Sequence, residues 1–208
     1  MPKVVDHAAR RAEVLEATWR VIVRAGLEGT TIREIAREAD CSTGVLSHYF
    51  TNKDEILRLA LDYAHDQVRD RVAALRQKMG GVQLLRAVLA EALPIDGLRQ
   101  VEMTLEISFW ARAIGRTSLR PSQNADFDRW QGRIRELIQL AVEAGELPAA
   151  LDADETATLM VCFTDGLGTD AVLYPGRFSP ARVDALLDHQ LIMLGADPAL
   201  LHDGAATR

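Results

Sequence analysis

Apolar residues recur along the chain at the three- and four-residue spacing of an α-helix, and no segment alternates as a half-buried strand would. Glycines and prolines interrupt this period at helix-length intervals, and no internal repeat is present. The pattern predicts an all-α fold of about nine helices and no sheet. We expect helices at residues 8–25, 31–39, 42–50, 52–79, 82–93, 97–119, 122–145, 152–174 and 180–194.

Two of the predicted helices are short and are joined by a tight turn at Asp40 and Cys41. Thr31 and Glu34 have the spacing of a capping box at the start of the first, and Ser42 is a good N-cap for the second. Two such helices behind a longer one have the geometry of a DNA-reading helix-turn-helix, although any tight helical corner can imitate it. We therefore predict a helix-turn-helix DNA-binding domain at residues 1–52 and a larger helical body at 53–208.

The second short helix is rich in groups that suit a DNA backbone. Hydroxyls and free N–H groups at a helix N-terminus attract a phosphate oxygen, and Gly44 would let the backbone approach the duplex closely. The helix has no Arg, Asn, Gln or Glu to read bases in pairs of hydrogen bonds, so sequence preference should depend on its few neutral side chains and on DNA shape. Arg33 could instead be a solvated surface residue, whereas Leu46 and Phe50 suit the core. The candidate DNA contacts are Thr31, Arg33, Ser42, Thr43, Gly44, Val45, Ser47, His48, Tyr49 and Lys53.

The run TTIREIAREADCSTGVLSHYFTNKDEIL resembles the DNA-binding domain of TetR-type (tetracycline-repressor-like) regulators. Its STG and SHYF elements are most similar to the BetI branch, which represses choline-to-betaine genes. The strong resemblance covers residues 10–60. It implies an all-helical homodimer whose small heads bind a palindromic operator, with Lys53 on a phosphate, and whose bodies sense a small molecule and dimerise through the last two long helices. The implied function is a ligand-responsive regulator, by family default a repressor; a helical ligand-binding adaptor without DNA binding is the alternative.

The net charge of −6 does not exclude a nucleic-acid partner, because the charge is unevenly placed. Residues 1–53 hold 8 Lys and Arg against 7 Asp and Glu, whereas the remainder holds 16 against 23. The five histidines are scattered and the two cysteines lie far apart, so no enzyme, metal or cofactor site is expected. No apolar run approaches the ~18 residues of a membrane helix, and no signal-peptide core is present, which predicts a cytoplasmic protein.

The body carries a second candidate site, on the predicted helix 97–119. Glu102 and Glu106 lie one turn apart within a broad apolar face, where carboxylates are costly unless they are paired or used. One interpretation is a pocket for a cationic or polar effector, with tryptophan rings supplying aromatic faces. The other is an ion pair with an arginine of a neighbouring helix, such as Arg133 or Arg135. Trp130 also suits the core, and Asp165 could face a dimer interface. The candidate pocket residues are Glu102, Glu106, Phe109, Trp110, Trp130, Phe163 and Asp165.

Overall fold

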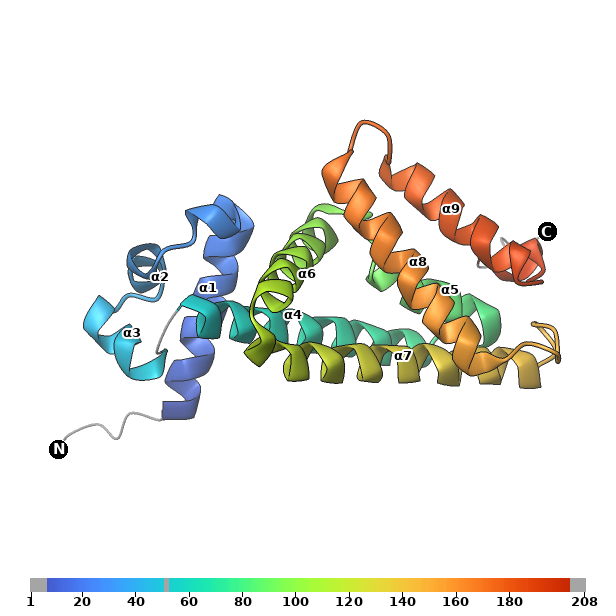
Figure 1. Ribbon diagram of the computed structural model, residues 1–208, viewed down its shortest axis with the longest axis horizontal. Coiled ribbons are helices and arrows are strands. Elements are labelled where there is room, and N and C mark those ends of the chain that lie inside the picture. Colours follow the sequence, from blue (N-terminus) through green and yellow to red (C-terminus); the bar gives the residue numbers. More distant parts are fainter. Residues whose placement is uncertain (1–6, 51–52, 203–208) are drawn as a thin grey trace. The chain divides into compact units, whose positions relative to one another are not determined.

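The computed structural model describes residues 7–50 and 53–202, and within these ranges the chain is helical without strands (Figure 1). The predicted all-α fold is confirmed. The described part contains nine α-helices and two short 3₁₀ helices: α1 (His7–Gly29), α2 (Ile32–Glu38), α3 (Thr43–Tyr49), α4 (Lys53–Arg76), α5 (Gly81–Glu91), α6 (Gly97–Gly115), η1 (Thr117–Leu119), α7 (Arg120–Glu143), α8 (Ala153–Leu173), α9 (Pro180–Met193) and η2 (Pro198–Leu200).

One predicted helix was too long. The segment 97–119 is helical only as far as Gly115, and a short 3₁₀ turn then leads into α7. Pro121 lies in the first turn of α7, where backbone N–H groups have no acceptor within the helix, so a proline is tolerated there. Helix α7 therefore begins at Arg120 rather than at residue 122.

The chain divides into two compact units, Met1–Gln67 and Val68–Arg208. In the first unit, α1, α2 and α3 pack around a small apolar core that includes Val14, Ile35, Leu46 and Phe50, each at most 5% exposed. Gly26 adopts a left-handed conformation, with φ of 69°, and kinks α1 near its end.

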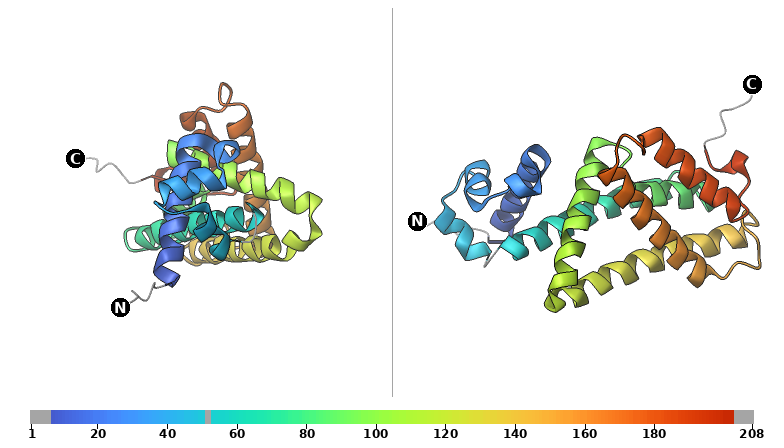
Figure 2. Two further views of the ribbon diagram at one scale, coloured as in Figure 1. Left: turned by 90° about the vertical axis from the view of Figure 1, so that its left-hand side faces the viewer. Right: turned by 45° about the horizontal axis from the view of Figure 1, so that its top comes forward.

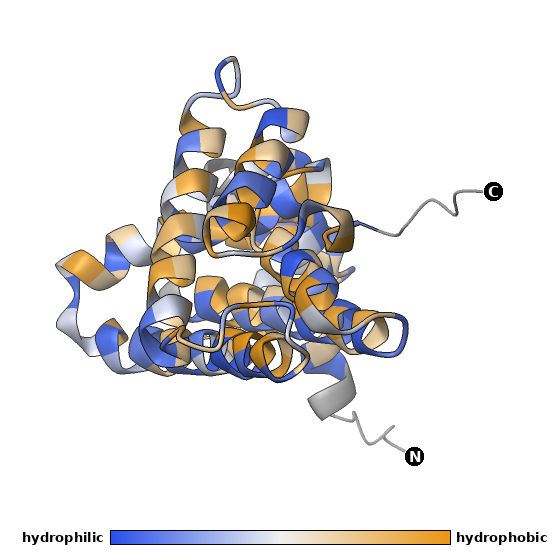
Figure 3. Cartoon of the chain, turned by 90° about the vertical axis from the view of Figure 1, so that its right-hand side faces the viewer, coloured by the Kyte–Doolittle hydropathy of each residue, from blue (hydrophilic) through white to orange (hydrophobic). Residues whose placement is uncertain are grey.

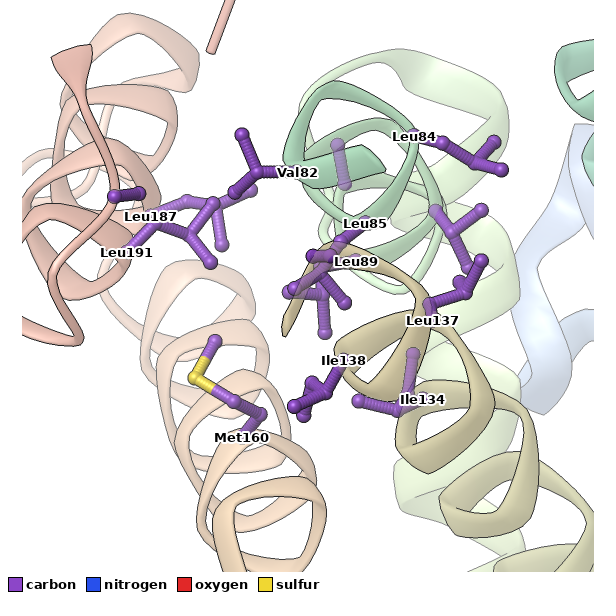
Figure 4. Packing of buried hydrophobic residues seen from close by; sticks show 14 of the residues in the cluster. Val82, Leu84, Leu85, Leu89, Ile134, Leu137, Ile138, Met160, Leu187 and Leu191 are labelled. Carbon is purple, nitrogen blue, oxygen red and sulfur yellow. The ribbon is translucent and has the colours of Figure 1, made fainter. Parts of the chain in front are cut away.

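The second unit has a larger core. Helix α7 packs against α5 and α8, and α9 packs against α5 (Figure 2). Figure 3 shows hydrophobic and hydrophilic residues interspersed along these helices, as expected of helices that have one apolar side. Figure 4 shows leucine, isoleucine and valine side chains of α5, α7 and α9 meeting Met160 of α8. No helix in the described ranges is both long and apolar enough to cross a membrane.

Candidate DNA-reading helix and effector site

Helices α2 and α3 form the helix-turn-helix geometry that the sequence predicts (Figure 1). The Thr31 hydroxyl accepts a hydrogen bond from the Glu34 backbone N–H at 3.2 Å, and the Ser42 hydroxyl accepts one from the Val45 N–H at 3.3 Å. Between the helices, Asp40 takes a positive φ of 48°, and the Cys41 N–H donates to the Ala36 carbonyl at 2.9 Å. The turn and both helix caps could therefore be predicted from the sequence.

The exposure of α3 separates a core side from an open side. Leu46 and Phe50 are buried, as expected of core residues, whereas Thr43 and Gly44 are exposed and Val45 is half-buried. Ser42 is exposed at the helix start, so the first turn of α3 is open to solvent there. The side chains of Ser47, His48, Tyr49 and Lys53 lie outside the described residues.

Ion pairs join α1 to α2. Arg20 and Arg24 both donate hydrogen bonds to the Glu38 carboxylate, at 2.9 and 2.7 Å. These hydrogen bonds lower the pKa of Glu38, and the one from Arg24 has the larger effect. Arg37 pairs with Glu34 on its own helix, whereas Arg33 is exposed and makes no ion pair within the described part of the chain. Of the two α2 arginines, Arg33 is therefore the better placed to reach a phosphate.

In the second unit, Glu102 lies in a buried ion-pair network. It is 7% exposed, and its two carboxylate oxygens accept hydrogen bonds from both terminal nitrogens of Arg71 on α4, at 3.0 and 2.7 Å. The Arg71 Nε also donates to Glu91 of α5 at 2.6 Å, and Arg99 of α6 contacts the other oxygen of Glu91. Burial raises the pKa of Glu102, while the Arg71 hydrogen bonds act in the opposite direction.

This network corrects the predicted pairing. The arginine that neutralises Glu102 is Arg71, not Arg133 or Arg135; Arg135 instead lies 3.5 Å from Asp154. Arg71 was missed because it lies 31 residues away, on a helix with many charged side chains and no local spacing to Glu102. Glu91 and Arg99 lie on either side of the connection between α5 and α6. Their opposite charges were the only feature of the sequence that could have predicted their ion pair.

Glu106 and Asp165 lie on facing turns of α6 and α8. The two helices approach closely at Gly168, where an added Cβ would come within 2.7 Å of the Met103 Cε. Glu106 follows Met103 by one turn, and Asp165 precedes Gly168 by one turn. Burial, together with the negative charge of Glu106, raises the pKa of Asp165 to about 7. No basic side chain in the described ranges pairs with Asp165.

The aromatic candidates have different environments. Phe109 is 2% exposed and belongs to the interior, whereas Trp110 is half-buried. Phe163 and Trp130 pack against the main core, and the guanidinium carbon of Arg133 lies 5.8 Å from the centre of the Trp130 ring. That ring already faces a cation of the protein itself. The acidic pair on α6 and α8 and the ring of Trp110 remain the better candidates for contact with a cationic ligand.

Comparison with known proteins gives two family matches along the chain. Residues 14–60 match the family described as bacterial regulatory proteins of the TetR family, and residues 81–195 match the C-terminal family of BetI-type transcriptional repressors. The chain is 34% identical over 191 residues to the HTH-type transcriptional regulator PksA of Bacillus subtilis (strain 168), covering 90% of each protein. It is 32% identical over 204 residues to the HTH-type transcriptional regulator BetI of Paraburkholderia phymatum, covering 96% of this chain and 100% of that one.

Two solved structures share the fold at somewhat lower identity. A transcriptional regulator from Rhodococcus sp. Rha1 is 27% identical, with a TM-score of 0.74 over 90% of this chain and 97% of that one. A putative transcriptional regulator from Saccharomonospora viridis, determined in complex with choline, is 26% identical, with a TM-score of 0.79 over 91% of this chain and 98% of that one.

Proposed function

The chain belongs to the TetR family of bacterial transcriptional regulators, and we propose that it is a dimeric repressor that a small cationic effector releases from a palindromic operator. The family makes it a DNA-binding regulator rather than an enzyme. The observation that carries the DNA-binding half is the capped α2–turn–α3 unit, with the N-terminal turn of α3 open on one side. We expect it to act in the cytoplasm, where its operator would lie.

On DNA, the first turn of α3 would meet the backbone of the major groove. The exposed Thr43 and Gly44 allow close approach, and the positive end of the helix dipole favours a phosphate oxygen. Arg33, which makes no ion pair in the described part, would add a phosphate contact from α2. The proposed contact set keeps all the sequence candidates: Thr31, Arg33, Ser42, Thr43, Gly44, Val45, Ser47, His48, Tyr49 and Lys53.

A second copy of the chain would cover the open faces of α8 and α9. Leu159 is 62% exposed and Met193 is 70% exposed, which leaves apolar surface without a partner in the single chain. Each helix carries an exposed stripe at helical spacing, and Gly166 in the α8 stripe would permit a close approach between subunits. The stripe residues are Leu159, Cys162, Gly166, Asp170 and Leu173 on α8, and Ala185, His189, Ile192 and Met193 on α9.

The effector would bind at the acidic pair of α6 and α8. Glu102 is bound by Arg71; on the facing turns of α6 and α8, Glu106 lies close enough to Asp165 to act on its charge, and these two carboxylates would face a ligand cation. The half-buried Trp110, one turn after Glu106, would supply an aromatic face. The choline held by the Saccharomonospora viridis protein supports a quaternary amine as the first effector to test.

The proposal is tested with gel-shift assays on the DNA upstream of the chain's own gene, first without and then with choline. We expect a shift that survives competitor DNA, weakens with salt and is lost as choline is added. Glu106→Gln with Asp165→Asn should keep the shift but lose the response to choline. A choline response that the double variant retains would refute the effector site, and the absence of any specific shift would refute the regulator itself.

A further inference from the structure

Arg10, in the first turn of α1, reaches the turn that joins α2 to α3. Its Nη2 donates hydrogen bonds to the backbone carbonyls of Ala39, at 3.2 Å, and of Asp40, at 3.4 Å. Its Nη1 donates to the Glu13 carboxylate of its own helix at 2.6 Å. The hydrogen bond with Glu13 raises the pKa of Arg10, and the Cys41 side chain acts in the same direction. One guanidinium therefore joins the start of α1 to a turn that lies 29 and 30 residues later in the sequence.

The position of this cation suits the end of α2 better than the start of α1. A positive charge is unfavourable in the first turn of its own helix and favourable beside the last carbonyls of another helix. Ala39 is the C-cap of α2, and carbonyls at a helix C-terminus have no donor within the helix. Arg10 supplies a charged donor to them, while Glu13 offsets its charge at the start of α1. The contact therefore stabilises the end of α2 from outside that helix.

The local hydrogen bonds of the α2–α3 turn reach back only to α2. The Asp40 and Cys41 N–H groups donate to the carbonyls of Arg37 and Ala36, at 3.3 and 2.9 Å. Asp40 has a φ of 48°, a left-handed conformation that is uncommon for residues other than glycine. The dihedral angles of this turn set the direction in which α3 leaves α2. Arg10 fixes the same turn to α1 as well.

Helix α1 also packs against α3 through the small core of the first unit. Val14, one turn after Arg10, is fully buried and belongs to the same core as Leu46 of α3 and Phe50 at its C-cap. Apolar packing is non-directional and leaves two helices some freedom to rotate against each other, whereas hydrogen bonds are directional. The Arg10 contact therefore restrains the orientation of α3 relative to α1.

We propose that Arg10 is a positioning residue for DNA recognition: it holds the α2–α3 turn against α1, so that α3 is oriented for the major groove, and it does not itself bind a phosphate. The proposal rests on the operator binding proposed above. Contacts to base edges require a fixed orientation of α3, whereas contacts to the uniform phosphate backbone tolerate a change in orientation. Loss of Arg10 should therefore reduce specific binding more than non-specific binding.

The test compares Arg10→Met with Arg11→Met, which removes the same charge from the next position. Arg11 is exposed and points about 100° away from Arg10 around the helix. Affinity is measured over a range of salt concentrations, for the DNA upstream of the chain's own gene and for unrelated DNA of equal length. Relative to Arg11→Met, we expect Arg10→Met to bind the upstream DNA about two- to tenfold more weakly, the contribution of a partly exposed hydrogen bond. The two variants should bind unrelated DNA equally, and Arg10→Met should keep the salt dependence of the unaltered chain.

Hydrogen exchange of the free protein tests the turn without DNA. The Asp40 and Cys41 amides should exchange faster in Arg10→Met than in Arg11→Met, because the turn then opens more often. The amide of Val21, whose side chain is buried in α1, should keep its protection in both variants. Equal exchange of the turn in both variants, or faster exchange throughout the first unit of Arg10→Met, would overturn the proposal.

Two results of the binding assay would also overturn it. The first is an equal ratio of specific to non-specific affinity in the two variants. The second is a fall of about 0.9 for each protomer in the slope of log affinity against log salt, because Arg10 would then be a phosphate contact. If the unaltered chain bound no DNA specifically, the proposed regulator would be refuted, and the exchange of the Asp40 and Cys41 amides would still decide whether Arg10 holds the turn.

Discussion

Replacing Arg71 by methionine should strongly destabilise the second unit. The substitution keeps an apolar side chain of similar length on α4 but removes three hydrogen bonds, one to Glu91 at 2.6 Å and two to Glu102 at 3.0 and 2.7 Å. Glu91 retains Arg99, whereas Glu102 loses its two hydrogen bonds from Arg71 while only 7% exposed. Breaking one side of a buried ion pair costs about 3–5 kcal/mol, and we expect a loss in that range.

The chain offers a matched control on the same helix. Arg76 makes an equally well-formed pair with Glu136, at 2.9 and 2.8 Å, but these side chains are 34% and 53% exposed. Exposed pairs contribute about 0–1 kcal/mol, so Arg76→Met should change the stability little. A second variant, Arg71→Met with Glu102→Leu, removes both charges and should recover much of the loss, because a buried pair can be replaced by apolar side chains at low cost.

The assay is chemical unfolding followed by circular dichroism at one protein concentration, since dimerisation makes stability depend on concentration. Lowering the pH should reduce the cost of Arg71→Met, because the buried Glu102 can then be protonated instead of remaining an uncompensated charge. A cost of Arg71→Met no larger than that of Arg76→Met would refute the view that this network holds α4 to α5 and α6.

Three further predictions concern pH, DNA and assembly. Because the pKa of Asp165 is raised, its contribution to stability is greatest below its ordinary pKa of 3.8 and falls until the pH passes about 7. Asp165→Asn has no carboxyl group to titrate, so its free energy of unfolding should rise relative to that of the wild type between pH 3.8 and about 7, by at most about 4 kcal/mol. A difference between the two proteins that does not change with pH would contradict the raised pKa. Lys53→Met should weaken operator binding and reduce the slope of log affinity against log salt by about 0.9 for each protomer, whereas an unchanged slope would remove Lys53 from the phosphate contacts. Leu159→Arg should yield monomers in sedimentation experiments, while Ile114→Arg, at an exposed apolar site on α6, should not; dimers in both would move the interface elsewhere.

Local features of the fold could be predicted from the sequence because a few neighbouring residues determine them. Thr31 and Ser42 cap their helices through backbone N–H groups three residues ahead, and Leu46 and Phe50 follow the helical period into the core. The end of α6 was missed, since Gly115 and Pro121 mark a break whose position depends on how α7 packs.

The candidate effector site was harder to predict because its charges are balanced through tertiary contacts. The spacing of Glu102 and Glu106 suggests the same role for both. In the structure, Glu102 forms an ion pair with Arg71, whereas the charge of Glu106 raises the pKa of Asp165. The position of Asp165 relative to Glu106 depends on the close approach of α6 and α8 at Gly168, which the sequence gives no means to locate.

A DNase footprint of this chain on the DNA upstream of its own gene, with and without choline, would test operator binding and its release by an effector together. We expect a protected stretch with two symmetric half-sites, because a symmetric dimer presents two α3 helices, and loss of that protection when choline is added. Protection that lacks two-fold symmetry, or no protection at any salt concentration, would contradict it.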